Sequence, residues 1–179
     1  REMERDGVLP IPIFINGVEG HTVVRDLLTT RYEQSQREKG VMSTLSLSPE
    51  AVRVDVIVNT IGFPLVGGPA GSMEGGRQAD VAREILTAKN VPYIVAAPLL
   101  IQDVSSWQQS GVQGLQTVVL FSLPELDGAI EPIVLGGLKG EDIELVPERV
   151  RRLLSRIKGS VRLQQSDPYD RFVSVIVYG

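Results

Sequence analysis

The sequence contains no cysteine and a single histidine, His21. The lack of cysteine excludes disulfides, a thiolate nucleophile and cysteine-ligated metal sites, and it fits a reducing compartment. A Ser-His-Asp triad would have to use His21, yet no serine lies in a G-x-S-x-G motif, and residues 71–73 continue differently. Because His21 begins a predicted helix, the other interpretation of this residue is a capping or packing role.

The sequence also lacks a strong charge of either sign and a long apolar run. The net charge of -4 argues against nucleic acid as a partner, since nucleic-acid binding favours a basic face. No uninterrupted apolar stretch reaches the roughly 18 residues of a transmembrane helix, and no signal or transit segment is visible. The chain begins at Arg1 and ends just after an apolar run, so we expect a piece of a larger protein.

Alternating apolar strands and amphipathic helices predict an α/β fold. With 179 residues, of which 42% are hydrophobic, the chain can bury one sizeable core. The alternation favours a three-layer, Rossmann-like or flavodoxin-like domain with a mostly parallel sheet over residues 1–163. Residues 164–179 would form a junction to a further segment. The predicted strands are 8–15, 54–58, 93–97, 115–121 and 172–178, with an extended piece at 132–135. The predicted helices are 22–28 (capped by Thr22), 77–89 (after Gly75 and Gly76), 104–109 and 148–158, with a polar linker at 31–49.

The most informative stretch is residues 54–86, in which a strand, a glycine-rich loop and a helix follow one another. The loop contains six glycines and two prolines, a composition that allows the backbone to approach a ligand closely. In open α/β sheets such a loop lies at the carboxyl end of a strand, where ligands bind. The sequence therefore predicts a site here.

The details of this loop argue against a phosphate ligand. A P-loop needs Lys followed by Ser or Thr at the start of the helix, whereas Arg77 and Gln78 follow the glycines. A dinucleotide-binding motif needs its first glycine directly after the strand, and an apolar, proline-containing excursion intervenes here. The remaining loop is largely apolar and has one carboxylate, Glu74, which suits a flat apolar ligand with a polar centre.

A second group of carboxylates, Glu125, Asp127 and Glu131, follows the predicted strand 115–121. Carboxylate oxygens suit Mg²⁺, and buried carboxylates can accept protons. The alternative is a solvated turn, since Asp127 is followed by glycine. Asp103 and Trp107 follow the predicted strand 93–97 and could line the same crevice, although a solitary tryptophan is more often a core residue.

Several motifs together resemble one known family. The segments IGFPLVGGPAGSMEGGRQADVA, VPYIVAAPLLIQD, LPELDGAIEP and VPERV, with GVLPIPIFINGVEGHTVVRDLLTT before them, are similar to the magnesium chelatase H and cobalt chelatase large-subunit family. The resemblance covers residues 7–163 and is specific, because several unusual motifs occur in the same order. Residues 162–170 depart from the expected pattern.

This resemblance implies a role in inserting Mg²⁺ into protoporphyrin IX, a step of chlorophyll and bacteriochlorophyll biosynthesis. It implies an ATP-driven AAA+ I subunit and a D subunit as partners, with ATP bound there and not in this chain. It also implies a location in the cytoplasm, or in the plastid stroma of a plant or alga. The isolated piece is expected to be inactive.

Site residues are assigned from chemistry and motif position. We expect Glu74 and Glu125 to be catalytic, with His21 and Gln78 as further candidates. The predicted metal-binding residues are Glu74, Glu125, Asp127 and Glu131, and the predicted substrate-binding residues are Gly68, Gly71, Met73, Gln78, Asp103 and Trp107. Two alternatives remain open: a non-catalytic scaffold or docking domain of the same subunit, and the equivalent domain of a cobalt chelatase.

Overall fold

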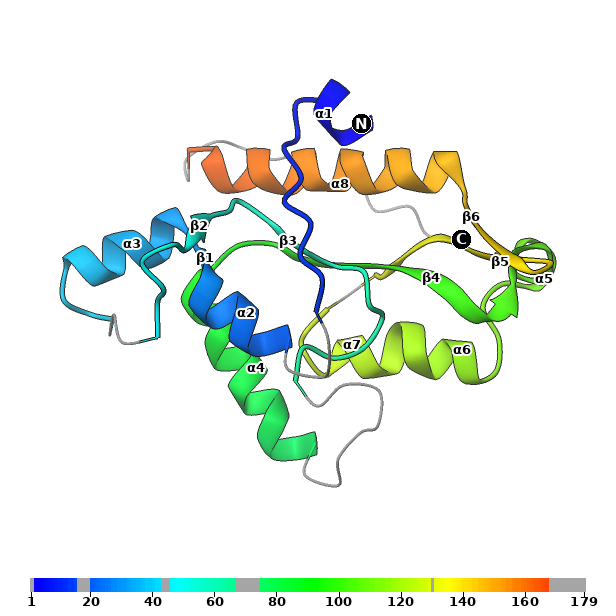
Figure 1. The fold of residues 1–179 in the computed structure, drawn as a ribbon, viewed down its shortest axis with the longest axis horizontal. Coiled ribbons are helices and arrows are strands. Elements are labelled where there is room, and N and C mark those ends of the chain that lie inside the picture. Colours follow the sequence, from blue (N-terminus) through cyan, green and yellow to red (C-terminus); the bar gives the residue numbers. More distant parts are fainter. Residues whose placement is uncertain (1, 16–19, 43–45, 67–74, 130, 168–179) are drawn as a thin grey trace.

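A four-stranded sheet lies between two layers of helices (Figure 1), which confirms the predicted α/β class. The computed structural model describes residues 2–15, 20–42, 46–66, 75–129 and 131–167. The helices are α1 (Glu2–Arg5), α2 (Gly20–Leu27), α3 (Arg31–Glu38), α4 (Gly75–Lys89), α5 (Val104–Ser110), α6 (Leu115–Thr117), the π-helical turn η1 (Val118–Ser122), α7 (Leu123–Glu125) and α8 (Pro147–Gln165). The strands are β1 (Leu28–Thr29), β2 (Val52–Arg53), β3 (Ile57–Asn59), β4 (Tyr93–Asp103), β5 (Ile133–Lys139) and β6 (Asp142–Leu145).

The sheet has the order β3-β4-β5-β6, and its first three strands are parallel. β6 pairs with β5 in the antiparallel direction, so the sheet is mostly parallel, as predicted. β1 and β2 form a separate, short parallel pair. The parallel strands place the loops after β3 and β4 at the same edge of the sheet, the edge where ligands bind in such folds.

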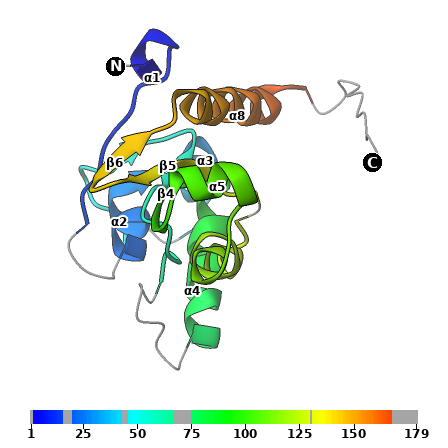
Figure 2. The ribbon, with the colours of Figure 1, turned by 90° about the vertical axis from the view of Figure 1, so that its right-hand side faces the viewer.

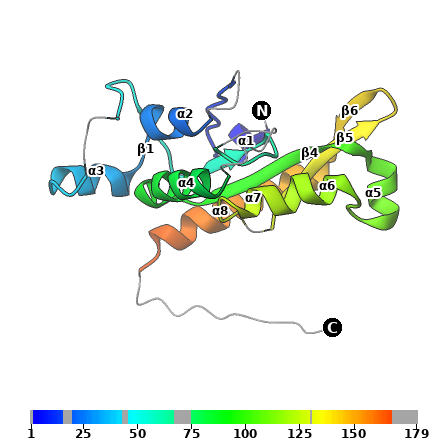
Figure 3. The same cartoon turned by 90° about the horizontal axis from the view of Figure 1, so that it is seen from below.

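The core is divided between the two faces of the sheet. On one face, Ile94 and Ala96 of β4 pack against Leu153 and Ile157 of α8. On the other face, alternate residues of β4 pack against η1, while β3 packs against α2 and α4. Figure 2 shows the layers from the side, with α8 above β4 and α4 below it, and Figure 3 shows the molecule from below, from the side of α4, α6 and α7. This is the three-layer architecture that the alternating pattern predicts.

The prediction of a strand at residues 115–121 is wrong, because the segment is helical. β-Branched and aromatic residues favour strands, but packing in the whole protein overrides that preference. Here the buried positions recur every four residues, at Gln116, Leu120 and Pro124, while Leu115 and Val118 are exposed. The place beside β4 is taken by β5, which extends the short piece predicted at residues 132–135.

Three smaller predictions near the N-terminus also need correction. Residues 8–15 form no strand, since Pro10 and Pro12 have no backbone N–H for a strand ladder. Thr22 does not cap its helix, because α2 already begins at Gly20. The polar segment 31–49 is not all linker. It contains α3, which Thr30 caps by accepting a hydrogen bond from the Glu33 backbone N–H.

The other predicted elements are present with shifted ends. β4 continues through Pro98 to Asp103, with a change of register between Ala97 and Pro98. The helices α4, α5 and α8 lie where the apolar periodicity places them. The predicted strand 172–178 lies outside the described residues, so the proposed junction at 164–179 stays a prediction.

Candidate functional site at the carboxyl end of β3

The site begins where β3 ends at Asn59 and the chain enters the glycine-rich loop. We call residues 61–65 the loop root. Gly62 has a φ of +77°, and a Cβ atom there would lie 3.1 Å from the Ala97 side chain. Leu65 is buried in the cluster formed by α2, β3 and α4. The loop root is therefore packed directly against the sheet and its helices.

Two polar side chains, Asn59 and Asp127, hold the backbone of the loop root. Asn59 accepts a hydrogen bond from the Ile61 backbone N–H (2.8 Å) and donates one to the Phe63 carbonyl (2.8 Å). Asp127 accepts a hydrogen bond from the Leu65 backbone N–H. Alternate residues of the loop root are thus bound by side chains, much as a neighbouring strand would bind them.

Tyr93 joins these two side chains. Its hydroxyl accepts a hydrogen bond from Asn59 Nδ2 (2.8 Å) and donates one to Asp127 Oδ2 (3.4 Å). Asp127 comes from the turn after α7, Tyr93 from the start of β4 and Asn59 from the end of β3. Three segments that are distant in the sequence therefore meet at the loop root, and we refer to Asn59, Tyr93 and Asp127 as the loop-root network.

Burial shifts the ionisation of both acidic members of the network. Burial raises the pKa of the Asp127 carboxyl, and the hydrogen bonds from Leu65 and Tyr93 offset part of this rise. Burial also raises the pKa of the Tyr93 hydroxyl, which keeps that hydroxyl protonated and able to donate. The network is a set of directed hydrogen bonds that ends on one carboxylate oxygen.

The carboxylates predicted to bind a metal do not gather in the described part of the chain. Glu125, at the end of α7, is exposed, and Glu131 pairs with Arg156 of α8 at 2.6 Å. Asp127 alone of the three lies at the loop root. No group of three or more acidic or histidine side chains that could hold a metal occurs among the described residues. The reason is local: the segment before them is helical, so they do not project together from one strand end.

Asp103 lies at a distance from the loop root along the sheet. Asn59 pairs with Val95, the residue before Ala96, and Ala96 pairs with Ile133 of β5, whereas Asp103 pairs with Leu138. The step from Ile133 to Leu138 corresponds to roughly 16 Å of strand. Asp103 and the loop root thus do not share one crevice.

Asp103 and Trp107 both have structural partners. Asp103 caps α5 by accepting hydrogen bonds from the backbone N–H groups of Ser105 (2.7 Å) and Ser106, and these bonds lower the pKa of its carboxyl. Trp107 packs against the cluster around Leu120 and lies under the Arg149 guanidinium, 5.5 Å from the ring centre. Such contacts account for both residues without a ligand.

Other predicted site residues lie in or beside the glycine-rich loop. Gly68, Gly71, Met73 and Glu74 lie outside the described residues, and Gln78 belongs to the first turn of α4. His21 is in the first turn of α2, whose Gly20 packs against Leu65. Its Nδ1 atom is buried and has no hydrogen-bond partner among the described residues. His21 thus directly follows the residue of α2 that lies beside the loop root.

The sequence analysis missed Asn59 and Tyr93, and it also missed a buried ion pair. Lys89, at the end of α4, donates to the carboxylate of Glu33 (2.8 Å) and to the carbonyls of Arg25 and Leu28. Burial lowers the pKa of the Lys89 ammonium.

The sequence does contain a signal for Asn59, since an amide at the end of an apolar strand needs buried hydrogen-bond partners.

The helical run α6–η1–α7 has two distinct faces. Its buried face includes Gln116, whose side-chain oxygen accepts hydrogen bonds from the Leu100 and Ile101 backbone N–H groups (3.0 Å each). Asp127 follows this run and accepts from Leu65. The exposed residues of the run include the large apolar side chains of Leu115, Val118 and Phe121, and Leu126, directly after α7, is also exposed.

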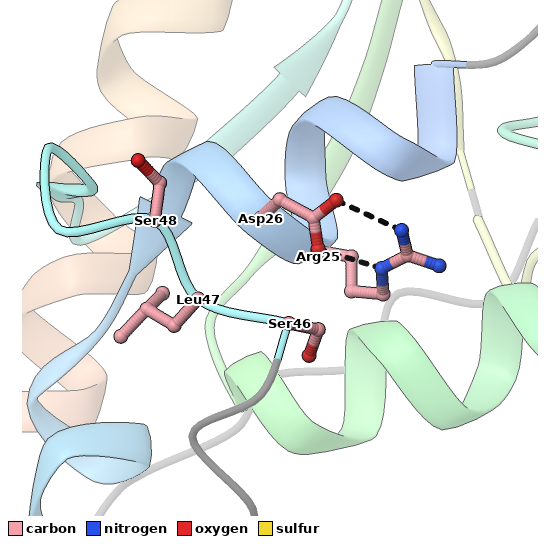
Figure 4. A pocket seen from close by; sticks show the side chains of 5 residues that line it. All are labelled: Arg25, Asp26, Ser46, Leu47 and Ser48. Carbon is pink, nitrogen blue, oxygen red and sulfur yellow. Dashed lines mark hydrogen bonds and ion pairs between the residues drawn. The ribbon is translucent and has the colours of Figure 1, made fainter.

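Two hollows among the described residues are lined by residues outside the loop root. One, of about 470 Å³, is open to solvent and lies between α2 and residues 46–48 (Figure 4). Arg25 and Asp26 on its wall form a two-bond ion pair with each other (2.7 and 2.8 Å). Another, of about 200 Å³, lies between α3, the end of α4 and the end of α8. Neither is lined by a predicted site residue.

Comparison with known proteins identifies the family. The family model described as CobN/Magnesium Chelatase matches residues 1–179. The chain belongs to the CobN/magnesium chelatase family. Its relatives include the magnesium-chelatase H subunit of Chlorobaculum parvum, which is 42% identical over 99% of this chain and 12% of that protein.

Two further family members come from distant organisms. The magnesium-chelatase H subunit of Rhodobacter capsulatus is 27% identical over 100% of this chain and 15% of that protein. The chloroplastic magnesium-chelatase ChlH subunit of Oryza sativa subsp. japonica is 30% identical over 99% of this chain and 12% of that protein. The chain thus spans between 12% and 15% of the length of these CobN/magnesium chelatase relatives. No solved structure matches it.

One negative finding bears on membranes. Among the described residues of this family member, no helix has both the length and the apolar character needed to cross a bilayer.

Proposed function

We propose that this chain is part of a magnesium chelatase H-type subunit, in which it forms one wall of the site where Mg²⁺ enters protoporphyrin IX. The observation that supports this most is the match to magnesium-chelatase H subunits over nearly the whole chain. The glycine-rich loop leaves the sheet at the edge where α/β proteins bind ligands, and its root is packed against the sheet.

The chemistry of the reaction needs carboxylates beside apolar walls. Mg²⁺ gives up its water ligands reluctantly, and the porphyrin must lose two N–H protons. In this proposal Glu74 and Glu125 bind the ion and accept protons, while Gly68, Gly71, Met73 and Gln78 face the macrocycle. Asp127 and Glu131 are weaker candidates for the ion, because Asp127 is bonded to Leu65 and Glu131 to Arg156.

The proposal includes partners that supply energy. ATP hydrolysis belongs to a separate AAA+ I subunit working with a D subunit, which agrees with the lack of a P-loop in this sequence. Mg²⁺ and protoporphyrin IX are substrates. The complex would work in the cytoplasm of a bacterium or in the plastid stroma of a plant or alga.

The test is the substitution Glu74→Gln in the full-length subunit, assayed with Mg²⁺, protoporphyrin IX, ATP and the partner subunits. Loss of the carboxylate removes a metal ligand and proton acceptor, so we expect product formation to fall by about 100-fold or more. The matched control is Glu84→Gln, an exposed glutamate of α4, which should keep normal turnover. Normal turnover of the Glu74→Gln variant would remove Glu74 from the mechanism.

A second candidate function is a scaffold or docking domain within the same subunit. The exposed apolar side chains of α6–η1–α7 and the separation of Glu125 from Asp127 and Glu131 favour it. Under this alternative, the Glu74→Gln variant chelates as well as its control, Glu84→Gln. A cobalt chelatase is distinguished in the same assay by replacing the substrates with Co²⁺ and a corrin precursor.

A further inference from the structure

Asp127 is placed as a support of the loop rather than as an open ligand. Its side chain is buried, and a single oxygen, Oδ2, accepts both the Leu65 backbone N–H and the Tyr93 hydroxyl. An amide has the same shape as a carboxylate and can present an oxygen at the same position. The hydrogen bonds at Oδ2 therefore need an oxygen acceptor and do not need the negative charge.

Asn59 supports the same segment from the other side. It binds the backbone at Ile61 and Phe63, and Tyr93 links it to Asp127. Every second residue of the loop root, Ile61, Phe63 and Leu65, thus has a backbone group bound by a side chain. These side chains come from two different parts of the chain. Such networks stabilise one arrangement of a segment when every member is paired.

We propose that Asn59, Tyr93 and Asp127 together fix the loop root, and that Asp127 is a positioning residue for magnesium insertion and not a ligand of the ion. This inference rests on the proposed function, because the position of the loop root affects catalysis only if magnesium insertion takes place beside it. Asn59 and Asp127 act through the loop backbone that they bind, and Tyr93 acts through these two side chains. None of the three needs to touch substrate.

The decisive comparison is Asp127→Asn against Asp127→Ala in the full-length subunit. The asparagine keeps the acceptor and removes the charge, whereas the alanine leaves the Leu65 N–H unpaired. Leaving a buried donor unpaired disfavours the native arrangement of the loop root by about fivefold or more. We expect Asp127→Asn to keep kcat and the KM for Mg²⁺ within about threefold of the wild type, since the hydrogen bonds persist. Asp127→Ala should lower kcat by at least about fivefold.

If Asp127 were a ligand of the ion, the asparagine variant would lose activity as well. Replacing a metal-binding carboxylate by an amide weakens the site for a hard cation, so the KM for Mg²⁺ would rise sharply in Asp127→Asn. That result would overturn the proposal. A merely structural role would leave turnover per folded molecule unchanged in Asp127→Ala, and this result would also overturn it. Tyr93→Phe provides a milder variant if the alanine protein fails to fold.

Hydrogen exchange of the full-length subunit tests the network without any assay of activity. Faster exchange of the peptide containing residues 61–65 in Asp127→Ala and in Asn59→Ala is expected, with Asp127→Asn close to the wild type. Unchanged exchange in both alanine variants would show that the network does not hold the loop root. If exchange changes and Glu74→Gln still chelates normally, the proposed function fails while the network stands.

Discussion

The ion pair between Lys89 and Glu33 shows how single residues fix this domain. Both side chains are at most 4% exposed, and Lys89 also binds two backbone carbonyls of α2 and β1. Glu33 is further bonded to Arg37 in the next turn of α3 (2.9 Å). These contacts join α2, α3 and the end of α4, and they hold β1 beside them.

Removing one partner of this ion pair should destabilise the chain severely. Lys89→Met removes the ammonium partner of the buried Glu33 carboxylate, which keeps its pair with Arg37. We therefore expect a cost of about 3 kcal/mol of unfolding free energy, the lower end of the range for a broken buried pair. Urea unfolding of the 179-residue chain measures it. Lys139→Met is the control, because its pair with Glu144 is exposed and its loss should barely shift the urea midpoint. Equal shifts for both variants would contradict this view of the buried pair.

Such residue-scale contacts are difficult to predict from the sequence. Glu33 lies in a polar, Ser- and Gln-rich segment that is typical of a surface linker, and its partner is 56 positions away. Local composition contains no information about a partner so distant. Asn59 was easier to predict, because an amide at the end of an apolar strand is a local signal in the sequence.

At the scale of elements, the contacts of β5 with its two neighbours depend on two adjacent glycines, Gly137 facing β4 and Gly136 facing β6. A Cβ atom at Gly137 would lie 2.6 Å from Leu99 Cβ and 2.7 Å from the Leu99 carbonyl oxygen. One at Gly136 would meet the backbone of Glu144 and Leu145. No side chain fits at either position, so β5 can lie close to both of its neighbours only because these residues are glycine.

Alanine substitutions at two glycines should therefore have opposite effects. Gly137→Ala forces Leu99 to move and should cost about 1–3 kcal/mol, with a lower Tm. Gly159→Ala lies in α8, where a Cβ atom has nothing within 4 Å, and should stabilise the chain by about 0.5–1 kcal/mol. Thermal unfolding of both variants checks the pair. A Gly137→Ala protein as stable as the wild type would show that the contact between β4 and β5 can open.

The elements themselves were predictable where one face of each is buried in a regular pattern. The amphipathic spacing of α8 and the β-branched run around β3 are local signals, and both elements are present. Residues 115–121 were mispredicted because a β-branched run is equally apolar in a strand and in a helix packed on a sheet. Only the neighbouring β5 decides between them, and β5 lies later in the chain.

At the scale of the whole molecule, the described residues form a wall and not an enclosure. The hollow of about 470 Å³ is open and lies beside α2, and none of the residues that line it belongs to the loop root. The relatives are several times longer than this chain, which covers 12% of the Chlorobaculum parvum protein. Under the proposed function, a macrocycle at the loop root would therefore need other parts of the subunit to cover it.

The isolated 179-residue chain should consequently form no metalloporphyrin, even with ATP and the partner subunits. The physical reason is that a wall open to water neither removes the hydration shell of Mg²⁺ nor holds the macrocycle in place. The change of the porphyrin absorption spectrum on metal insertion is the measurement, with the full-length subunit as the positive control. Turnover by the isolated chain would show that this wall alone is sufficient.

The π-helical turn η1 sets the number of residues between Gln116, which binds β4, and Asp127, which binds the loop root. A π-helical turn contains one residue more than an α-helical turn, and each residue of an α-helix corresponds to about 100° of rotation. Deleting one residue from η1 would rotate the turn that follows α7 relative to Gln116. Gln116 binds the β4 backbone and Asp127 binds Leu65, so both could no longer face inward together. The segment between them is a spacer whose outer face can vary in sequence but whose residue count is fixed.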